Sequence, residues 1–205
     1  MRVLLFDLYG LFIPVQTREG FEAIARSVGV DADALLPLYL GQNRRDYDAG
    51  VLDARGLWDR IGRALGVEID WRVALKQDLA SWSGRNEQMV DYVRQLHETG
   101  TPMALLSNIP AEFARQVRAE QPWIEECFDP VLLSCEIGLA KPEAPMFATA
   151  LRLLRERFGE GLDAADVLFT DDSRANIDAA AACGLTVHHF QGIDGLRDAV
   201  TAHLG

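Results

Sequence analysis

A short apolar run near the start of the chain, Val3 to Phe6, constrains the fold more than any other feature. A carboxylate, Asp7, follows at once, and Tyr9 and Gly10 then mark a turn. An apolar run of this length that ends at a turn is typical of a strand buried on both faces. An acidic side chain at the end of such a strand lies at the carboxyl edge of the sheet, where open α/β folds bind ligands.

Residues 14–83 carry no strand pattern but repeat apolar residues at three- and four-residue spacings. Three such stripes predict three helices, within 21–28, 57–65 and 73–79. We interpret this segment as a small helical cap inserted directly after the first strand. Its arginines are expected to lie on solvated helix faces: Arg44, Arg45, Arg55, Arg60 and Arg63.

From residue 85 onward, strand and helix patterns alternate. Four further strands are predicted, at 103–107, 130–134, 166–170 and 185–190. Alternating strands and helices imply a parallel sheet with right-handed crossovers. We therefore predict an α/β fold in which 1–13 and 84–205 form a Rossmann-like catalytic core and 14–83 forms the helical cap.

Polar side chains lie just beyond four of the predicted strands: Asp7, Ser107, Lys141 and the pair Asp171 and Asp172. They converge at one edge if the first strand lies in the middle of the sheet, which gives the strand order 5-4-1-2-3. Carboxylates gathered at one edge repel one another. A hard divalent cation with oxygen ligands relieves that repulsion, and Mg²⁺ suits such a site.

The remaining polar residues at this edge suit a phosphoryl group. Ser107 and Asn108 precede one predicted helix and Lys141 precedes another, and helix N-termini favour anions. Together with a metal ion they would stabilise the charge on a phosphate ester. Asp7 would then attack phosphorus and form an aspartyl phosphate. The residues favour a magnesium-dependent hydrolase of small phosphate monoesters.

Composition limits the partners. The formal net charge of -11 argues against nucleic acids and anionic membrane surfaces. No apolar stretch reaches membrane-spanning length, and Asp7 comes too early for a signal peptide. The three cysteines have no metal-type spacing, which is typical of a reducing compartment. We expect a cytoplasmic monomer or homodimer whose partner is a small phosphorylated metabolite.

Four segments resemble the ordered motifs of the haloacid dehalogenase-like hydrolase superfamily: FDLYG, LLSN, GLAKPEAPMF and LFTDDSRANIDAAAACG. The resemblance covers the whole chain, including a cap after the first strand. Within this superfamily, the chain is similar to the branch that contains the N-terminal phosphatase domain of soluble epoxide hydrolase and the bacterial glucose-1-phosphate phosphatases.

The resemblance implies roles for individual residues. Asp7 would be the nucleophile and a metal ligand, with the backbone carbonyl of Tyr9 and the carboxylate of Asp172 as further ligands. Asp171 and Asn176 would hold metal-bound water. Phosphate would be bound by Ser107, Asn108 and Lys141.

Tyr9 departs from the pattern of the family's phosphatases, which usually carry an acid–base aspartate two residues after the nucleophile. The family's 2-haloacid dehalogenases have tyrosine there, but they work without metal and lack paired aspartates such as Asp171 and Asp172. Because displacing halide needs no metal site, the pair favours a phosphatase. A dehalogenase and a weakly active phosphate-binding or regulatory module are the alternatives. General acid–base help is worth about 10²–10⁴-fold in rate.

Overall fold

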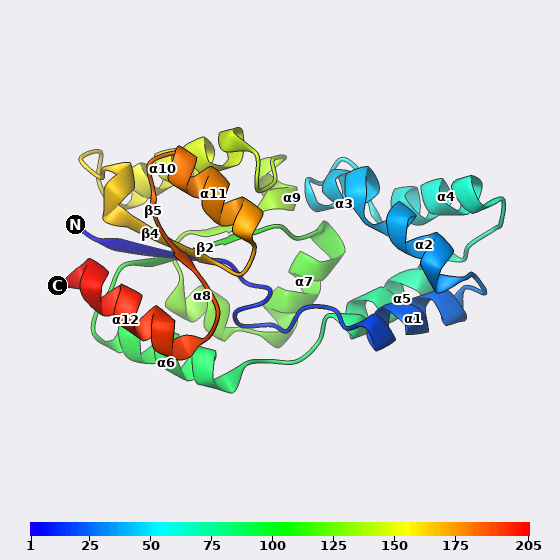
Figure 1. Cartoon of the computed structure of the whole chain (residues 1–205), viewed down its shortest axis with the longest axis horizontal. Coiled ribbons are helices and arrows are strands. Elements are labelled where there is room, and N and C mark those ends of the chain that lie inside the picture. Colours follow the sequence, from blue (N-terminus) through cyan, green and yellow to red (C-terminus); the bar gives the residue numbers. More distant parts are fainter.

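The computed structural model describes all residues 1–205 and has a five-stranded parallel sheet at its centre (Figure 1). The strands are β1 (Val3–Phe6), β2 (Met103–Ser107), β3 (Val131–Leu133), β4 (Val167–Asp171) and β5 (Thr186–His189). Their order is β3-β2-β1-β4-β5, which confirms the predicted order read from the other edge. The first strand is therefore central, with β2 and β4 as its neighbours.

Helices cover both faces of the sheet, as expected for a doubly wound fold. They are α6 (Glu87–Glu98), α7 (Ala111–Glu120), α8 (Trp123–Cys127), α9 (Ser134–Ile137), α10 (Ala144–Phe158), the 3₁₀ turn η1 (Ala164–Asp166), α11 (Arg174–Ala182) and α12 (Ile193–Leu204). Alternate residues of β1 enter two separate apolar clusters: Val3 and Leu5 join α10 and α11, whereas Leu4 and Phe6 join α6 and α12. Both faces of β1 are buried, as the apolar run predicts.

β3, β4 and β5 differ at their ends from the predicted strands, and the differences in β3 and β4 have local reasons. β3 stops at Leu133 because Ser134 already begins the short helix α9. β4 starts at Val167 because Asp166 belongs to the preceding 3₁₀ turn, and it extends to Asp171. The prediction ended this strand at Thr170, so Asp171 lies within the sheet edge rather than after it.

Five helices fill the segment predicted to hold three. They are α1 (Arg18–Ser27), α2 (Ala32–Tyr39), α3 (Gly41–Asp48), α4 (Ala54–Leu65) and α5 (Trp71–Ser81). The prediction missed α2, which contains Pro37, and α3, whose sequence is almost entirely polar. In Figure 1 the five helices lie together beyond one end of the sheet, and we refer to them as the cap.

The chain leaves the core for the cap and returns to it close to the end of β1. Tyr9 and Ile13 form an isolated β-bridge on the outgoing segment. On the returning segment, the Asn86 N–H donates to the carbonyl of Phe12 at 2.8 Å, and its side-chain amide donates to the carbonyl of Leu11 at 3.1 Å. These contacts hold the base of the cap beside the residues that follow Asp7. No helix has the length and apolar character needed to cross a membrane.

Candidate active site

The predicted site residues meet at the carboxyl ends of the three central strands. Asp7 follows β1, Ser107 ends β2 and Asp171 ends β4. Lys141 reaches them from the segment between α9 and α10. The convergence follows from the parallel topology, which places all of these strand ends at one edge.

Lys141 bridges two carboxylates at the centre of this edge. Its Nζ lies 2.8 Å from Asp7 Oδ1 and 2.7 Å from Asp171 Oδ2, and only 1% of its side chain is exposed. Burial alone would lower the pKa of the ammonium group, but the attraction of Asp7 and Asp171 outweighs burial and raises that pKa. Lys141 is therefore a permanent positive charge in the site.

The two oxygens of Asp7 have different surroundings. Oδ1 accepts hydrogen bonds from the Leu8 N–H at 2.7 Å and from Lys141. Oδ2 makes no hydrogen bond to the protein, which leaves its lone pairs available. Burial raises the pKa of Asp7 to about 8, against the pull of Lys141. A cation bound beside Asp7 would stabilise the carboxylate and lower that pKa.

Asp171 is fully buried, and both of its oxygens accept hydrogen bonds. The Ser173 N–H donates to Oδ1 at 2.7 Å, and the Asn176 amide lies 3.0 Å from each oxygen. Lys141 Nζ also donates a hydrogen bond to Oδ2. Asn176 thus orients Asp171 in this structure, and its predicted contact with metal-bound water stays a prediction.

The donor set fits a hard divalent cation. Carboxylate oxygens of Asp7, Asp171 and Asp172 lie within 4.8 Å of one another. Such oxygens, from carboxylates in part open to water, are the ligands that Mg²⁺ prefers. Asp172 lies on the solvent side of the group, whereas Asp7 and Asp171 are buried. The carbonyl of Tyr9 as a further ligand stays a prediction.

Gly10 gives Asp172 its space, a role that the sequence analysis did not assign. Gly10 has φ +81°, and a Cβ built on it would lie 2.2 Å from Asp172 Oδ2. Any larger residue at position 10 would displace a carboxylate of the candidate metal site. The sequence signal was present, because a glycine in the turn directly after a strand often marks a close approach of the backbone to another group.

Ser107 and Asn108 differ in what their side chains do. The hydroxyl of Ser107 is buried and has no hydrogen-bond partner in the protein. A buried polar atom without a partner is costly, so a ligand oxygen at this position would be stabilising. The Asn108 side chain accepts from the Lys141 N–H at 2.8 Å and donates to the Lys141 carbonyl at 2.7 Å. Asn108 therefore fixes the backbone of Lys141, and its own contact with phosphate stays a prediction.

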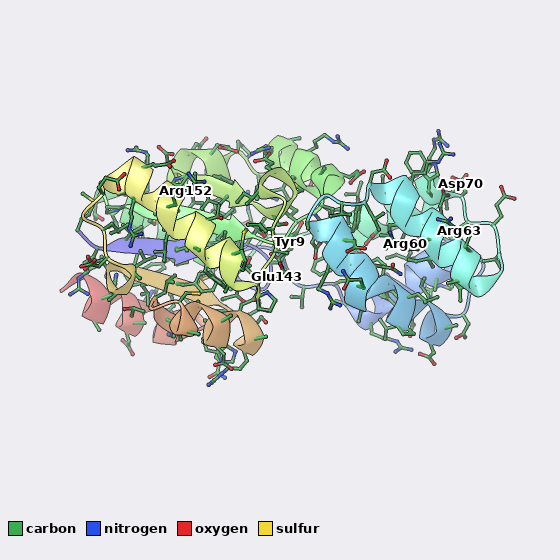
Figure 2. The ribbon with its side chains drawn as sticks, turned by 90° about the horizontal axis from the view of Figure 1, so that it is seen from above. Tyr9, Arg60, Arg63, Asp70, Glu143 and Arg152 are labelled. Carbon is green, nitrogen blue, oxygen red and sulfur yellow. The ribbon has the colours of Figure 1, made fainter.

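Tyr9 lies where the core meets the cap (Figure 2). Its ring packs edge-on against Trp82, with the ring centroids 5.0 Å apart. Burial raises the pKa of the phenol well above its usual range. The phenol thus stays protonated and is unsuited to act as a base.

A polar network in the cap faces this site, and the sequence analysis missed it. Arg44 Nε lies 2.8 Å from Asp48 Oδ1, and Arg44 also donates to the Tyr39 hydroxyl at 2.7 Å. That hydroxyl donates to Asp78 at 2.7 Å. The expectation of a solvated Arg44 is wrong, because the aromatic rings of Tyr39, Trp82 and Phe113 surround its guanidinium group.

Comparisons with known proteins found relatives in sequence and in fold. The sesquiterpene phosphatase astK of Aspergillus oryzae (strain ATCC 42149 / RIB 40) is 23% identical over 144 residues, which cover 70% of each chain. The HAD family enzyme bt-2542 of Bacteroides thetaiotaomicron, solved with magnesium and inorganic phosphate, is 20% identical with a TM-score of 0.75 over 92% of this chain and 93% of that one.

A dehalogenase has a similar fold but a weaker match. L-2-haloacid dehalogenase of Xanthobacter autotrophicus has a TM-score of 0.64 and 18% identity, and covers 91% of this chain and 76% of its own. The model of the haloacid dehalogenase-like hydrolase family matches residues 1–184. The chain therefore belongs to the haloacid dehalogenase-like hydrolases.

Proposed function

We propose that this hydrolase cleaves small phosphate monoesters with the help of Mg²⁺, through attack of Asp7 on phosphorus. One observation carries the proposal: Asp7, Asp171 and Asp172 gather around the buried ammonium group of Lys141. Such a group can hold a divalent cation and the charge of a phosphoryl group in one place. The free Oδ2 of Asp7 and the unpartnered hydroxyl of Ser107 fit the same ligand.

The reaction has two steps. Asp7 Oδ2 forms a bond to phosphorus while the bond from phosphorus to the leaving oxygen breaks, and that oxygen takes up a proton. Water then attacks the phosphorus of the aspartyl phosphate, loses a proton, and releases inorganic phosphate and the Asp7 carboxylate. Bound Mg²⁺ would supply positive charge to the phosphoryl oxygens and to Asp7. Lys141 holds Asp7 in place and adds a second positive charge, and Ser107 donates to a phosphoryl oxygen.

The relatives support the phosphatase over its alternatives. A sesquiterpene phosphatase is a relative in sequence, and a neighbour in fold was solved with magnesium and phosphate. The dehalogenase alternative is favoured by Tyr9, but it gives no use to the exposed carboxylate of Asp172. The physiological substrate, the cytoplasmic location and the oligomeric state stay predictions.

A phosphate-release screen tests the proposal. Sugar phosphates, nucleotides, and aryl and alkyl phosphates are offered with magnesium and with excess chelator. We expect multiple-turnover phosphate release that needs magnesium and that Asp7→Asn abolishes without lowering the thermal stability. The matched control is Asp53→Asn, which changes the residue that caps the N-terminus of α4, and this variant should keep its activity. Halide release from 2-chloropropionate in chelator would favour the dehalogenase, and binding without turnover would favour the regulatory module.

A further inference from the structure

The reaction proposed above needs a proton donor for the leaving oxygen. Residue 9, where the family's phosphatases usually carry the acid–base aspartate, is a tyrosine whose ring packs against Trp82. Lys141 is held between two carboxylates, and Asp171 accepts hydrogen bonds on both oxygens. The cap, whose base is fixed beside the residues that follow Asp7, carries a further buried carboxylate.

Asp48, the last residue of α3, is the cap carboxylate that is fastened to the phosphate-binding side of the core. Its backbone carbonyl accepts a hydrogen bond from the Ser134 hydroxyl. That hydroxyl accepts in turn from the Ile109 N–H at 2.8 Å, two residues beyond Ser107. One buried serine thus ties the end of α3 to the loop that follows β2.

Gly50 brings the same part of the cap against the core. It has φ +71°, and a Cβ built on it would lie 2.9 Å from the carbonyl oxygen of Cys135. The absence of a side chain lets the turn after α3 pack directly on α9. The end of α3 is consequently fixed by two neighbouring contacts, one from the Asp48 carbonyl to the Ser134 hydroxyl and one from Gly50 to the backbone of Cys135.

The carboxyl group of Asp48 has one engaged oxygen and one free oxygen. Oδ1 accepts from Arg44 Nε at 2.8 Å, whereas Oδ2 makes no hydrogen bond to the protein. Asp48 is 8% exposed. Burial raises its pKa, although Arg44 and the ammonium group of Lys141 both pull it down. The contact of its carbonyl with Ser134 places Asp48 beside the loop that follows β2 and Ser107.

Arg44 holds the carboxyl group in a single orientation. Its guanidinium group contacts the rings of Tyr39 and Trp82 and donates to the Tyr39 hydroxyl. Asp78 accepts from that hydroxyl, which completes a network of charged and polar groups from α2, α3 and α5. A carboxyl group that is held in one orientation with one free oxygen can give and take a proton at that oxygen.

We propose that Asp48 is the general acid and base of the reaction, supplied by the cap in place of residue 9. This inference rests on the proposed phosphatase function. The Oδ2–H of Asp48 gives its proton to the leaving oxygen as the bond from that oxygen to phosphorus breaks and Asp7 Oδ2 bonds to phosphorus. The Asp48 carboxylate then takes a proton from the water that attacks the aspartyl phosphate, so that both residues return to their starting state.

If Asp48 is the general acid, its loss should slow only the cleavage of esters whose leaving group needs a proton. In Asp48→Asn, kcat/KM for an alkyl phosphate should fall by about 10²–10⁴-fold. For 2,4-dinitrophenyl phosphate, whose phenolate leaves unprotonated, the first step should change little. The dependence of log(kcat/KM) on the leaving-group pKa should become steeper across a series of substituted phenyl phosphates.

The matched control is Asp46→Asn on the same helix, since Asp46 pairs with Arg60 at 2.7 Å near the surface. It should leave the leaving-group dependence of kcat/KM unchanged. An equal loss on alkyl and dinitrophenyl phosphates in Asp48→Asn, or no loss on either, would overturn the assignment of Asp48 alone. A parent protein that releases no phosphate from dinitrophenyl phosphate would overturn the proposed function and this inference together.

Discussion

Replacing Lys141 with methionine removes the charge between two buried carboxylates while keeping the length of the side chain. Lys141 Nζ lies 2.8 Å from Asp7 and 2.7 Å from Asp171, and its side chain is almost fully buried. Without it the two carboxylates are left close together in a region of low dielectric, where their negative charges repel each other. We expect a large loss of stability in magnesium-free buffer.

The size of the loss follows from the burial of the group. Removing one partner of a buried ion pair costs about 3–5 kcal/mol, because the remaining charge is uncompensated. For a chain of 205 residues, that loss corresponds to a fall in Tm of about 6–20 °C, at about 2–4 °C per kcal/mol. The difference from the parent should shrink as the pH falls, because Asp7, whose pKa burial raises, takes up a proton and loses its charge.

Thermal unfolding of parent and variant, with chelator and with saturating magnesium, measures the effect. Magnesium binding to the folded state should stabilise Lys141→Met more than the parent, because the cation replaces the missing positive charge. The chain has one other lysine, the exposed Lys76, and Lys76→Met is the matched control. A Tm for Lys141→Met within 2 °C of the parent in chelator, on the order of the effect of 1 kcal/mol, would refute the reasoning.

Two further substitutions test the metal site and the cap network. Gly10→Ala should weaken magnesium binding and lower kcat/KM, because its Cβ would lie 2.2 Å from Asp172 Oδ2. The control is Gly29→Ala, at φ +70° with no atom within 4 Å, which carries the same backbone strain and should keep both magnesium binding and kcat/KM. Equal effects of the two substitutions would contradict the role of Gly10. Burial raises the pKa of Asp78 from 3.8 to about 6, so the folded state binds this proton more tightly and the parent loses stability as the pH rises through that window. The free energy of unfolding of Asp78→Asn should therefore rise by up to about 3 kcal/mol relative to the parent between about pH 4 and pH 7. Urea unfolding at several pH values measures this, and parallel plots of unfolding free energy against pH for the two proteins would contradict it.

The sheet and the central site were predictable from the sequence because their signals are local. Each strand is a short apolar run, and the polar residue at its end marks the ligand-binding edge. The requirement that Asp7, Lys141 and Asp171 converge was enough to place β1 in the middle of the sheet, which the structure confirms. Parallel topology makes such an inference possible, since all carboxyl ends share one edge.

The cap was poorly predicted because its signals are tertiary. α2 contains a proline and α3 reads GQNRRDYD, so neither has the apolar period that marks a helix. Arg44 was predicted to lie on the surface for the same reason. The rings of Tyr39 in α2, Trp82 just after α5 and Phe113 in α7 surround it, and the last two are distant from it in sequence.

The role of the Asn108 side chain was also hidden. Its position after β2 predicts a contact with phosphate, which stays a prediction, but gives no sign of the two hydrogen bonds that its amide makes to the backbone of Lys141. The two residues are 33 positions apart, and no sequence pattern connects them. Spacing identifies which residues reach the sheet edge, whereas the contacts between those residues require the folded chain.

Trapping of the aspartyl phosphate tests the central claim most directly. The enzyme is mixed with magnesium and an aryl phosphate, whose good leaving group makes hydrolysis of the intermediate the slower step, and is then quenched into borohydride. Borohydride reduces an acyl phosphate to an alcohol, so a phosphorylated Asp7 becomes homoserine, which peptide mass spectrometry detects. The account predicts homoserine at position 7 alone, in amounts that fall to zero in chelator. Reduction at another carboxylate, or turnover by the same preparation without any homoserine, would contradict it.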